Sequence, residues 1–329
     1  MLVAVDLSPD AAFFAAHPEE IFVNDRGERG RVWTSVCDTS GKPLHAQYDF
    51  TGFGNAPLKD GETWAFSYGG PAWRAFAEEK LTRFVRRLKA SPAGNIVVGF
   101  HLLGGMDGQF VQWEYRPHHG HFDYSEGNRR ALGEYLKGIY GSEAALREAW
   151  GDGRVTFATA ANPSVAEFGS VPFFDDKPGK GRRLADCRRF VSSGLARNLN
   201  AMARRAKDEW GRPSVVELWW TTAIWPQPSR LALDELIAGR AVDIVKTVSW
   251  YAPERSIGGI GGSGNNLGES LSRRGVLYVQ EMDHRTRRSG KVDNPWWTDE
   301  KVGMPPDDAG YELQITRDAA SVIAALSIV

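Results

Sequence analysis

Apolar residues along the chain recur in two patterns, short continuous runs and longer amphipathic stretches. The short runs, such as residues 1–5 and 275–281, predict buried parallel strands. The longer stretches, such as residues 71–89, place apolar residues at helical spacing between charges and predict amphipathic helices. Strands alternate with helices without hairpin signals, which predicts a parallel sheet with crossover helices. The expected strands are 1–5, 95–102, 214–220, 242–250 and 275–281; the expected helices are 71–89, 126–140, 143–150, 184–210, 231–238, 267–273 and 308–327.

Residues 24–70 show no sustained hydrophobic period and are rich in Gly, Asp and Trp. We expect a long loop over one face of the domain here. About five strands then remain, three fewer than a closed (β/α)8 barrel contains. Because an open barrel leaves buried edges unpaired, either strands are hidden in residues 24–70 or the sequence is a fragment, and we favour the fragment. The fold class predicted is α/β, an incomplete (β/α)8 TIM barrel forming a single domain over residues 1–329.

The composition narrows the class of ligand. Lys and Arg number 40 against 41 Asp and Glu, which gives no electrostatic reason to expect nucleic acid or an anionic membrane as partner. A neutral substrate fits better. Twelve Trp residues supply flat apolar faces that suit sugar rings, although large barrels also bury many Trp, so we expect about half of the candidates to be core. The candidates for sugar stacking are Trp33, Trp64, Trp113, Trp219, Trp220 and Trp250.

Several classes of site find no support in the sequence. Cys37 and Cys187 form no disulfide framework or metal pattern and are interpreted as ordinary thiols. The start lacks the basic and apolar regions of a signal peptide, and no run approaches 18 apolar residues, so we expect a soluble, cytoplasmic protein. The histidines at 118, 119 and 121 are interpreted as loop residues rather than metal ligands. Neither a GxSxG elbow nor a phosphate-binding loop occurs, and we expect no cofactor.

Two strand ends carry candidate chemistry, because catalytic groups of a parallel barrel gather at the carboxyl ends of its strands. Glu281 ends one strand and is followed by Asp283, His284 and Arg285, which could fix its charge and orientation. The alternative is a plain salt bridge at a strand terminus. The second strand end runs into Gly104-Gly105, where paired glycines either let the backbone approach a ligand or simply turn the chain.

Three collinear segments carry a resemblance to a known family. The first contains Asp123-Tyr124-Ser125, Tyr135-Leu136, Tyr140-Gly141-Ser142-Glu143, Leu146 and Ala149-Trp150-Gly151, then Val155-Thr156-Phe157 and Pro163. The second is His17-Pro18-Glu19-Glu20, and the third comprises Glu281, Asp283, Arg285 and Thr286. Together they resemble the β-galactosidases of glycoside hydrolase family 42, and more closely their uncharacterised bacterial relatives. The resemblance covers roughly residues 1–286 and implies that the chain begins at barrel strand three and ends after helix seven.

The family implies an acid/base carboxyl after strand four and a nucleophile after strand seven, and Glu281 matches the nucleophile. The acid/base is normally the Glu of a Gly-Glu-Trp-like stretch, but this sequence has Gly108-Gln109-Phe110 there. Gln has the shape of Glu but cannot give or take a proton. Three explanations stay open, in this order: an engineered Glu→Gln change, a takeover by Asp107 or Glu114, or a natural non-catalytic member.

The function predicted is a retaining glycoside hydrolase, β-galactosidase-like, that acts on a neutral sugar through a covalent glycosyl-enzyme. The alternative is an inactive carbohydrate-binding barrel. The expected partner is an oligosaccharide or glycoside substrate, and the oligomeric state stays open, although trimers occur among the relatives. Besides Glu281 and Gln109, the expected substrate contacts are His101, Asp107, Trp113, Glu217, Trp219, Trp250, Tyr251 and Arg285.

Overall fold

The computed structural model describes residues 1–37, 43–106, 108–110, 113, 122–170, 177–220, 231–248 and 268–281. The chain divides into two compact units. The first comprises Met1–Trp220 and Pro226–Ile244, and the second comprises Thr221–Trp225 and Val245–Val329.

A parallel sheet organises the first unit. Its strands are β1 (Leu2–Asp6), β5 (Gly99–Leu103) and β6 (Val215–Trp219), paired in the order β1-β5-β6. Both pairings are parallel, with Val5 opposite Leu102 and Leu102 opposite Leu218. β1 and β6 lie where the apolar runs predicted strands, whereas β5 begins four residues later than predicted because residues 92–96 form a 3-10 helix. The predicted α/β class with a parallel sheet is confirmed.

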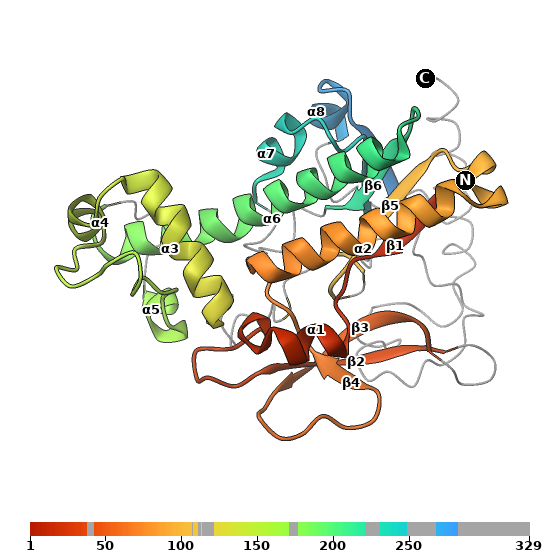
Figure 1. The fold of residues 1–329 in the computed structure, drawn as a ribbon. Coiled ribbons are helices and arrows are strands. Elements are labelled where there is room, and N and C mark those ends of the chain that lie inside the picture. Colours follow the sequence, from red (N-terminus) through yellow and green to blue (C-terminus); the bar gives the residue numbers. More distant parts are fainter. Residues whose placement is uncertain are drawn as a thin grey trace, which may run out of the picture. The chain divides into compact units, whose positions relative to one another are not determined.

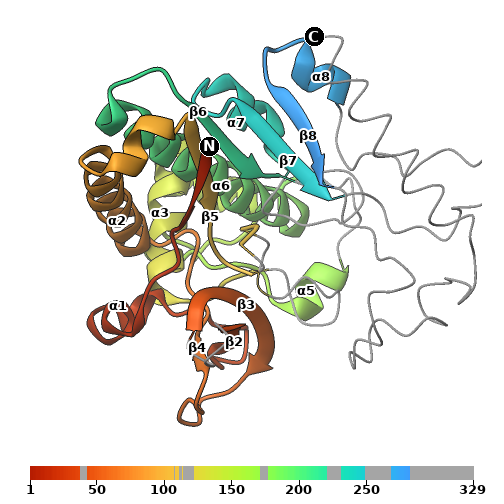
Figure 2. The same ribbon diagram turned by 90° about the vertical axis from the view of Figure 1, so that its right-hand side faces the viewer.

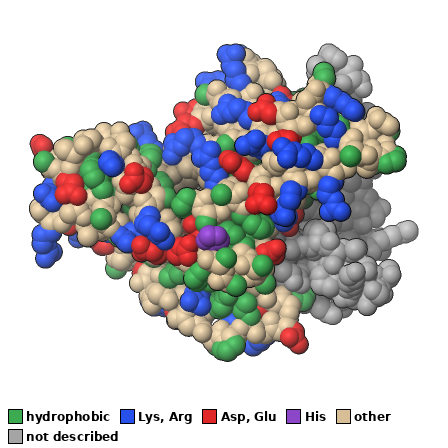
Figure 3. Space-filling model, in the orientation of Figure 1, with side chains coloured by type: hydrophobic (Ala, Val, Ile, Leu, Met, Phe, Trp, Pro, Cys, Tyr) green, Lys and Arg blue, Asp and Glu red, His purple; other side chains and the backbone are tan. Residues whose placement is uncertain are grey.

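Two long helices, α2 (Pro71–Lys89) and α6 (Lys180–Trp210), lie side by side and cover one face of this sheet (Figures 1 and 2). Phe100 is fully buried on that face, and its ring meets the Trp210 ring edge to face at 5.5 Å. Each fully buried side chain of this size contributes about 1.5–3 kcal/mol to folding. The charged side of α2 stays in solvent, where basic side chains are interspersed with acidic ones (Figure 3).

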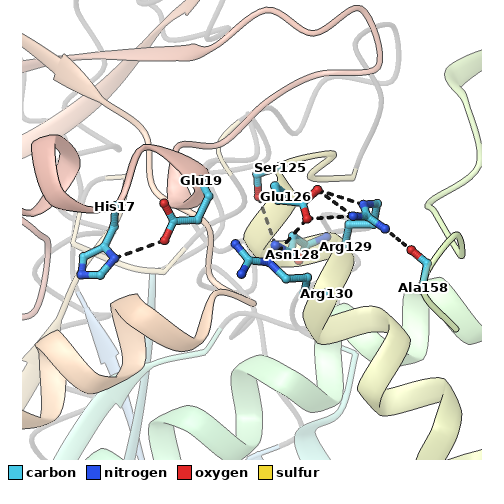
Figure 4. Close-up of polar contacts among 8 residues, drawn as sticks. All are labelled: His17, Glu19, Ser125, Glu126, Asn128, Arg129, Arg130 and Ala158. Carbon is cyan, nitrogen blue, oxygen red and sulfur yellow. Dashed lines mark hydrogen bonds and ion pairs between the residues drawn. The ribbon is translucent and has the colours of Figure 1, made fainter.

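Helices α3 (Glu126–Tyr140) and α4 (Glu143–Trp150) begin and end where the sequence predicts. Ser125 caps α3 by accepting the Asn128 amide at 3.3 Å, and Gly141 ends it in the left-handed conformation. Figure 4 shows the first turn of α3, where Arg129 pairs with Glu126 and also donates to the Ala158 carbonyl. The shorter helices are α1 (Ala11–Ala16), η1 (Pro18–Glu20), η2 (Pro92–Ile96), α5 (Val165–Ser170) and α7 (Leu233–Ala238).

Residues 24–70 form a second, antiparallel sheet, so the prediction of a long loop without hairpins was wrong. Its strands are β2 (Gly30–Cys37), β3 (Pro43–Phe53) and β4 (Glu62–Trp64), in the order β3-β2-β4. The β2–β3 pairing shifts register at three places, beginning between Arg31 and Val32. Each irregularity moves following side chains to the other face, which breaks the alternation that would reveal strands. In the described pairing this small sheet is separate from the parallel one, so it supplies none of the strands missing from the barrel count.

The second unit contains most of β7 (Ile244–Val248) together with α8 (Gly268–Ser272) and β8 (Leu277–Glu281). Strand β7 and strand β8 are neighbours in the sheet order. The chain leaves α8 through Gly275, whose φ of +74° favours glycine, and enters β8 after the Val276 amide bonds the Leu271 carbonyl at 3.1 Å. The predicted helix at 308–327 lies outside the described residues. None of the described helices is both long and apolar enough to cross a bilayer.

Candidate active site

The carboxyl edge of the parallel sheet in the first unit is built from the ends of β1, β5 and β6 at Asp6, Leu103 and Trp219. The segments that leave β1 and β5 are bonded to each other. The Asp6 carboxylate accepts the Ser8 amide at 2.9 Å, and the Ser8 hydroxyl oxygen accepts the Gly105 amide at 3.1 Å. This edge is where parallel barrels carry catalytic groups.

Gln109 lies in a tight turn that folds back onto the end of β5. The Phe110 amide donates to the Gly104 carbonyl at 2.7 Å, and the Gly104 amide donates to the Gly108 carbonyl at 3.2 Å. Gly105 and Gly108 have φ of +69° and +68°, and Phe110 has φ of +52°. A bulky residue in the left-handed region costs about 1–3 kcal/mol, and such strain concentrates at functional sites.

An aromatic cluster formed by Phe66, Tyr68, Trp73, Phe110 and Trp113 compensates that strain. The Phe110 side chain is 1% exposed and packs among these rings. The two glycines of the turn approach the cluster closely: a Cβ on Gly104 would lie 2.4 Å from the Phe110 ring, and one on Gly105 would lie 1.9 Å from the Tyr68 hydroxyl. Only glycine fits at these contacts, so the cluster fixes the backbone on both sides of the half-buried Gln109.

Three of the five described sugar-stacking candidates are buried. Trp113 is 1% exposed; its indole nitrogen donates to the Phe66 carbonyl at 2.7 Å and its ring stacks on Tyr68. Although we predicted that Trp113 contacts substrate, its ring is part of the core that supports the turn. Trp219 and Trp220 are also buried, whereas Trp33 is exposed and Trp64 half-buried.

The sheet places His101 and Glu217 side by side. They are register partners on β5 and β6, and Nδ1 of His101 lies 2.5 Å from Oε1 of Glu217. Because Phe100 and Leu102 face the helices, the alternation of a strand turns His101 to the opposite face, which in a barrel is the interior. His101 Nε2 is buried and has no hydrogen-bond partner.

A lysine of α2 contacts the segment that follows β1. The Lys80 ammonium donates to the Ser8 carbonyl at 2.8 Å. Burial lowers the pKa of Lys80, and the nearby Asp6 and Asp10 carboxylates act against that shift. Asp6 and Ser8 were not predicted as site residues. The signal available was positional: Asp6 is a carboxylate at the end of an apolar strand, as Glu281 is.

Two buried carboxyl groups, Glu20 and Asp123, belong to two of the segments that resemble family 42, and these two segments contact each other in the fold. Glu20 is 1% exposed, and its Oε1 accepts the Ala72 amide at the start of α2 at 3.2 Å. Burial raises the pKa of Glu20 to about 7, and burial raises the pKa of Asp123 to about 6. Asp123 accepts hydrogen bonds from the amide and the hydroxyl of Ser125. The sequence marked both as motif members but gave no sign that they are buried.

Glu281 is the last residue of β8, the strand end at which it was predicted. Its side chain lies outside what the structure describes, as do Asp107, Glu114, Trp250, Tyr251, Arg285 and the histidines at 118, 119 and 121. Within the described part of the chain, no cluster of His, Cys, Asp or Glu has the composition of a metal site.

No protein-family model and no curated protein sequence matches the chain. Among solved structures, the catalytic domain of β-amylase from Paenibacillus polymyxa is similar with a TM-score of 0.52 and 15% identity, over 94% of this chain and 68% of that one. β-Galactosidase from Marinomonas ef1 gives a TM-score of 0.47 at 14% identity over 78% of this chain, and β-galactosidase from Rahnella sp. R3 gives 0.46 at 13% over all of it.

The chain spans 31% of the Marinomonas protein and 46% of the Rahnella protein. At these identities the likeness bears on the fold alone. The β-amylase match supports the predicted fold class, a parallel α/β architecture of the barrel type.

Proposed function

We propose that this chain is the barrel portion of a retaining glycoside hydrolase that acts on a neutral sugar, with Glu281 as nucleophile and Gln109 at the acid/base position. The observation that carries the proposal is the turn that holds Gln109. A backbone turn closed by Gly104 and anchored by Phe110 fixes the main chain of Gln109 at the carboxyl end of a parallel strand.

The chemistry that the proposal requires uses two groups on opposite sides of the scissile bond. Glu281 attacks the anomeric carbon and forms a covalent glycosyl-enzyme, while the second group protonates the leaving oxygen. Gln109 can hold that oxygen by a hydrogen bond from its amide but has no proton to transfer. The protein as given therefore forms the glycosyl-enzyme only with leaving groups that depart without acid assistance.

The His101–Glu217 pair supplies a sugar contact on the interior face of the sheet. Glu217 accepts from Nδ1, which fixes the imidazole orientation and leaves Nε2 for a ligand. A buried ring nitrogen without a partner costs about 1–3 kcal/mol, and a sugar hydroxyl that reaches it recovers that cost. Specificity for galactose follows the sequence resemblance and belongs to the proposal.

The experiment that tests the proposal is hydrolysis of an activated aryl β-galactoside by Gln109→Glu and Glu281→Gln. With an activated leaving group the second step, hydrolysis of the glycosyl-enzyme, limits kcat, and the restored carboxylate is the base that activates the water for that step, so Gln109→Glu should raise kcat by about 10²–10⁴-fold. Glu281→Gln should abolish turnover in both backgrounds. A matched control is Glu148→Gln, which makes the same change on the exposed side of α4 and should leave the rate unaltered.

A second candidate is a carbohydrate-binding barrel without hydrolysis, and Gln109 itself favours it. The two functions differ in one result. If Gln109→Glu leaves turnover at background while the protein still binds galactosides by calorimetry, the chain is a binding protein and the hydrolase proposal fails.

A further inference from the structure

The small antiparallel sheet presents two tryptophans on one side. In the β2–β4 register, Arg31 lies opposite Trp64 and Trp33 lies opposite Glu62, so these four side chains share a face. Val32 turns to the other face and is fully buried. The two views place this sheet beyond α1, away from α6 (Figures 1 and 2). We call the face formed by Arg31, Trp33, Glu62 and Trp64 the tryptophan face.

An ion pair forms the floor between the two indoles. Arg31 pairs with Glu62 and also donates to the carbonyls of Ala56 and Pro57 at 3.0 and 2.9 Å. Both charged side chains are largely buried, at 11% and 13% exposed. The charges of Arg31 and Glu62 offset each other and the donors of Arg31 are engaged, so this pair does not select a charged ligand.

Both indoles are held in place. A Cβ on Gly61 would lie 2.8 Å from the indole nitrogen of Trp33, so the ring edge lies directly against the Gly61 backbone, which has φ of +79°. Trp64 carries the guanidinium groups of Arg29 and Arg31 at 5.5 and 5.8 Å from its ring centre. Rings fixed before a ligand arrives lose little entropy on binding.

Trp33 is nevertheless 46% exposed. Among the side chains that the structure describes in β2, β3 and β4, Trp33 is the exposed large apolar one. Its solvent-accessible surface amounts to about 100 Å². A stable protein interface buries about 800 Å² on each partner. The tryptophan face is therefore too small an apolar surface for a second copy of the chain, but it matches the apolar face of one sugar ring.

We propose that the tryptophan face is a saccharide-binding site that takes a neutral polysaccharide chain by stacking a sugar ring on Trp33. The exposed Arg29 guanidinium above Trp64 donates hydrogen bonds to hydroxyls at the rim. Such a site holds the chain on a polymeric ligand whether or not the protein hydrolyses it.

Affinity electrophoresis in native gels that contain β-1,4-galactan, soluble starch or xylan tests this proposal. The wild-type chain should be retarded by at least one of these neutral polymers. Trp33→Ala should weaken that binding about tenfold, which is the loss of about 1.4 kcal/mol expected for one aromatic stack. Trp33→Tyr should retain part of the retardation, and Gly61→Ala, which pushes on the indole, should lose part of it.

Ile139→Ala is the matched control, because Ile139 is 42% exposed on α3, outside the tryptophan face. It should migrate as wild type does. Glu281→Gln should also bind as wild type does, so that a failure of the proposed hydrolysis does not affect this assay. Equal retardation of wild type and Trp33→Ala would overturn the proposal, as would the absence of retardation in all three polymers. So would a wild-type dimer that Trp33→Ala converts to a monomer in sedimentation experiments.

Discussion

Nδ1 of His101 lies 2.5 Å from Oε1 of Glu217, and the two residues are register partners on adjacent parallel strands. The pair is buried on the face of the sheet that the helices do not cover. Buried polar groups stay in a fold only when they are paired or when function requires them. Here one ring nitrogen is paired and the other is not, and under the proposed function the unpaired nitrogen is the one that would contact the sugar.

We expect the two side chains to be energetically coupled. Glu217→Ala should lower the free energy of unfolding by about 3–5 kcal/mol, because it leaves the imidazole without its acceptor. The His101→Ala, Glu217→Ala double variant should lose less than the sum of the single losses, by about 0.5–3 kcal/mol. Urea unfolding of the four proteins measures this. Strictly additive losses would show that the two groups do not interact.

The turn that holds Gln109 should be intolerant of a single methyl group. Gly105→Ala places a Cβ 1.9 Å from the Tyr68 hydroxyl at a φ of +69°, so we expect a loss of more than about 2 kcal/mol of stability. Gly138→Ala is the control: it sits within α3 with nothing within 4 Å of the new Cβ, and should gain about 0.4–1 kcal/mol. Thermal unfolding compares the two. A Gly105→Ala protein as stable as wild type would mean that the aromatic cluster does not constrain the turn.

Glu20 should make stability depend on pH. Burial raises its pKa in the folded protein to about 7 from an ordinary value of 4.5, so the folded state holds this proton more tightly than the unfolded chain does. The resulting stability is fully present below about pH 4.5 and is lost as the pH rises through about 7. Glu20→Gln should therefore be more stable than wild type at pH 8 by about 1–2 kcal/mol, less than the full shift implies because the Gln amide has one acceptor oxygen where the carboxylate has two.

The measurement for Glu20 is urea unfolding of wild type and variant between pH 5 and 8. Glu148→Gln on the exposed side of α4 provides the control and should follow wild type throughout. If the difference in unfolding free energy between Glu20→Gln and wild type does not grow with pH, another group causes the pH dependence. Asp123, whose pKa burial raises to about 6, would be the next residue to substitute.

The rate gained by Gln109→Glu should depend on the leaving group. In kcat/KM, which reports departure of the leaving group, aryl β-galactosides with acidic phenols need little protonation, so we expect a small gain for them, and for poorly departing phenols or sugars a gain that approaches about 10⁴-fold. A plot of log kcat/KM against the phenol pKa should be steep for the protein as given and shallow for Gln109→Glu. Equal slopes for the two proteins would show that another residue protonates the leaving group. Asp107, Glu114 and Asp6 would then be the carboxylates to test.

Elements whose signals are local could be predicted from the amino-acid sequence alone. Helices α2, α3 and α4 follow from their apolar period and from caps such as Ser125 and Gly141, which act within one turn of chain. The positions of the parallel strands follow from their apolar runs, but their burial does not: β1 was predicted to be buried, whereas Leu2 and Ala4 on it are exposed. The strand-end positions of Glu281 and Gln109 were also predictable, because each residue lies at or just after the end of a strand that the apolar pattern predicts.

Only the tertiary structure decided which of these residues meet. His101 and Glu217 are far apart in sequence, and nothing local to either shows that the register brings them into contact. The small antiparallel sheet was hidden because its bulges interrupt the period of two, so pairing with β3 and β4 makes β2 a strand. Burial divided the tryptophans: Trp113 and Trp33 have the same side chain, but one packs among aromatic rings and the other lies on the open face of a sheet. Burial depends on the packing of distant segments, and a residue type does not encode it.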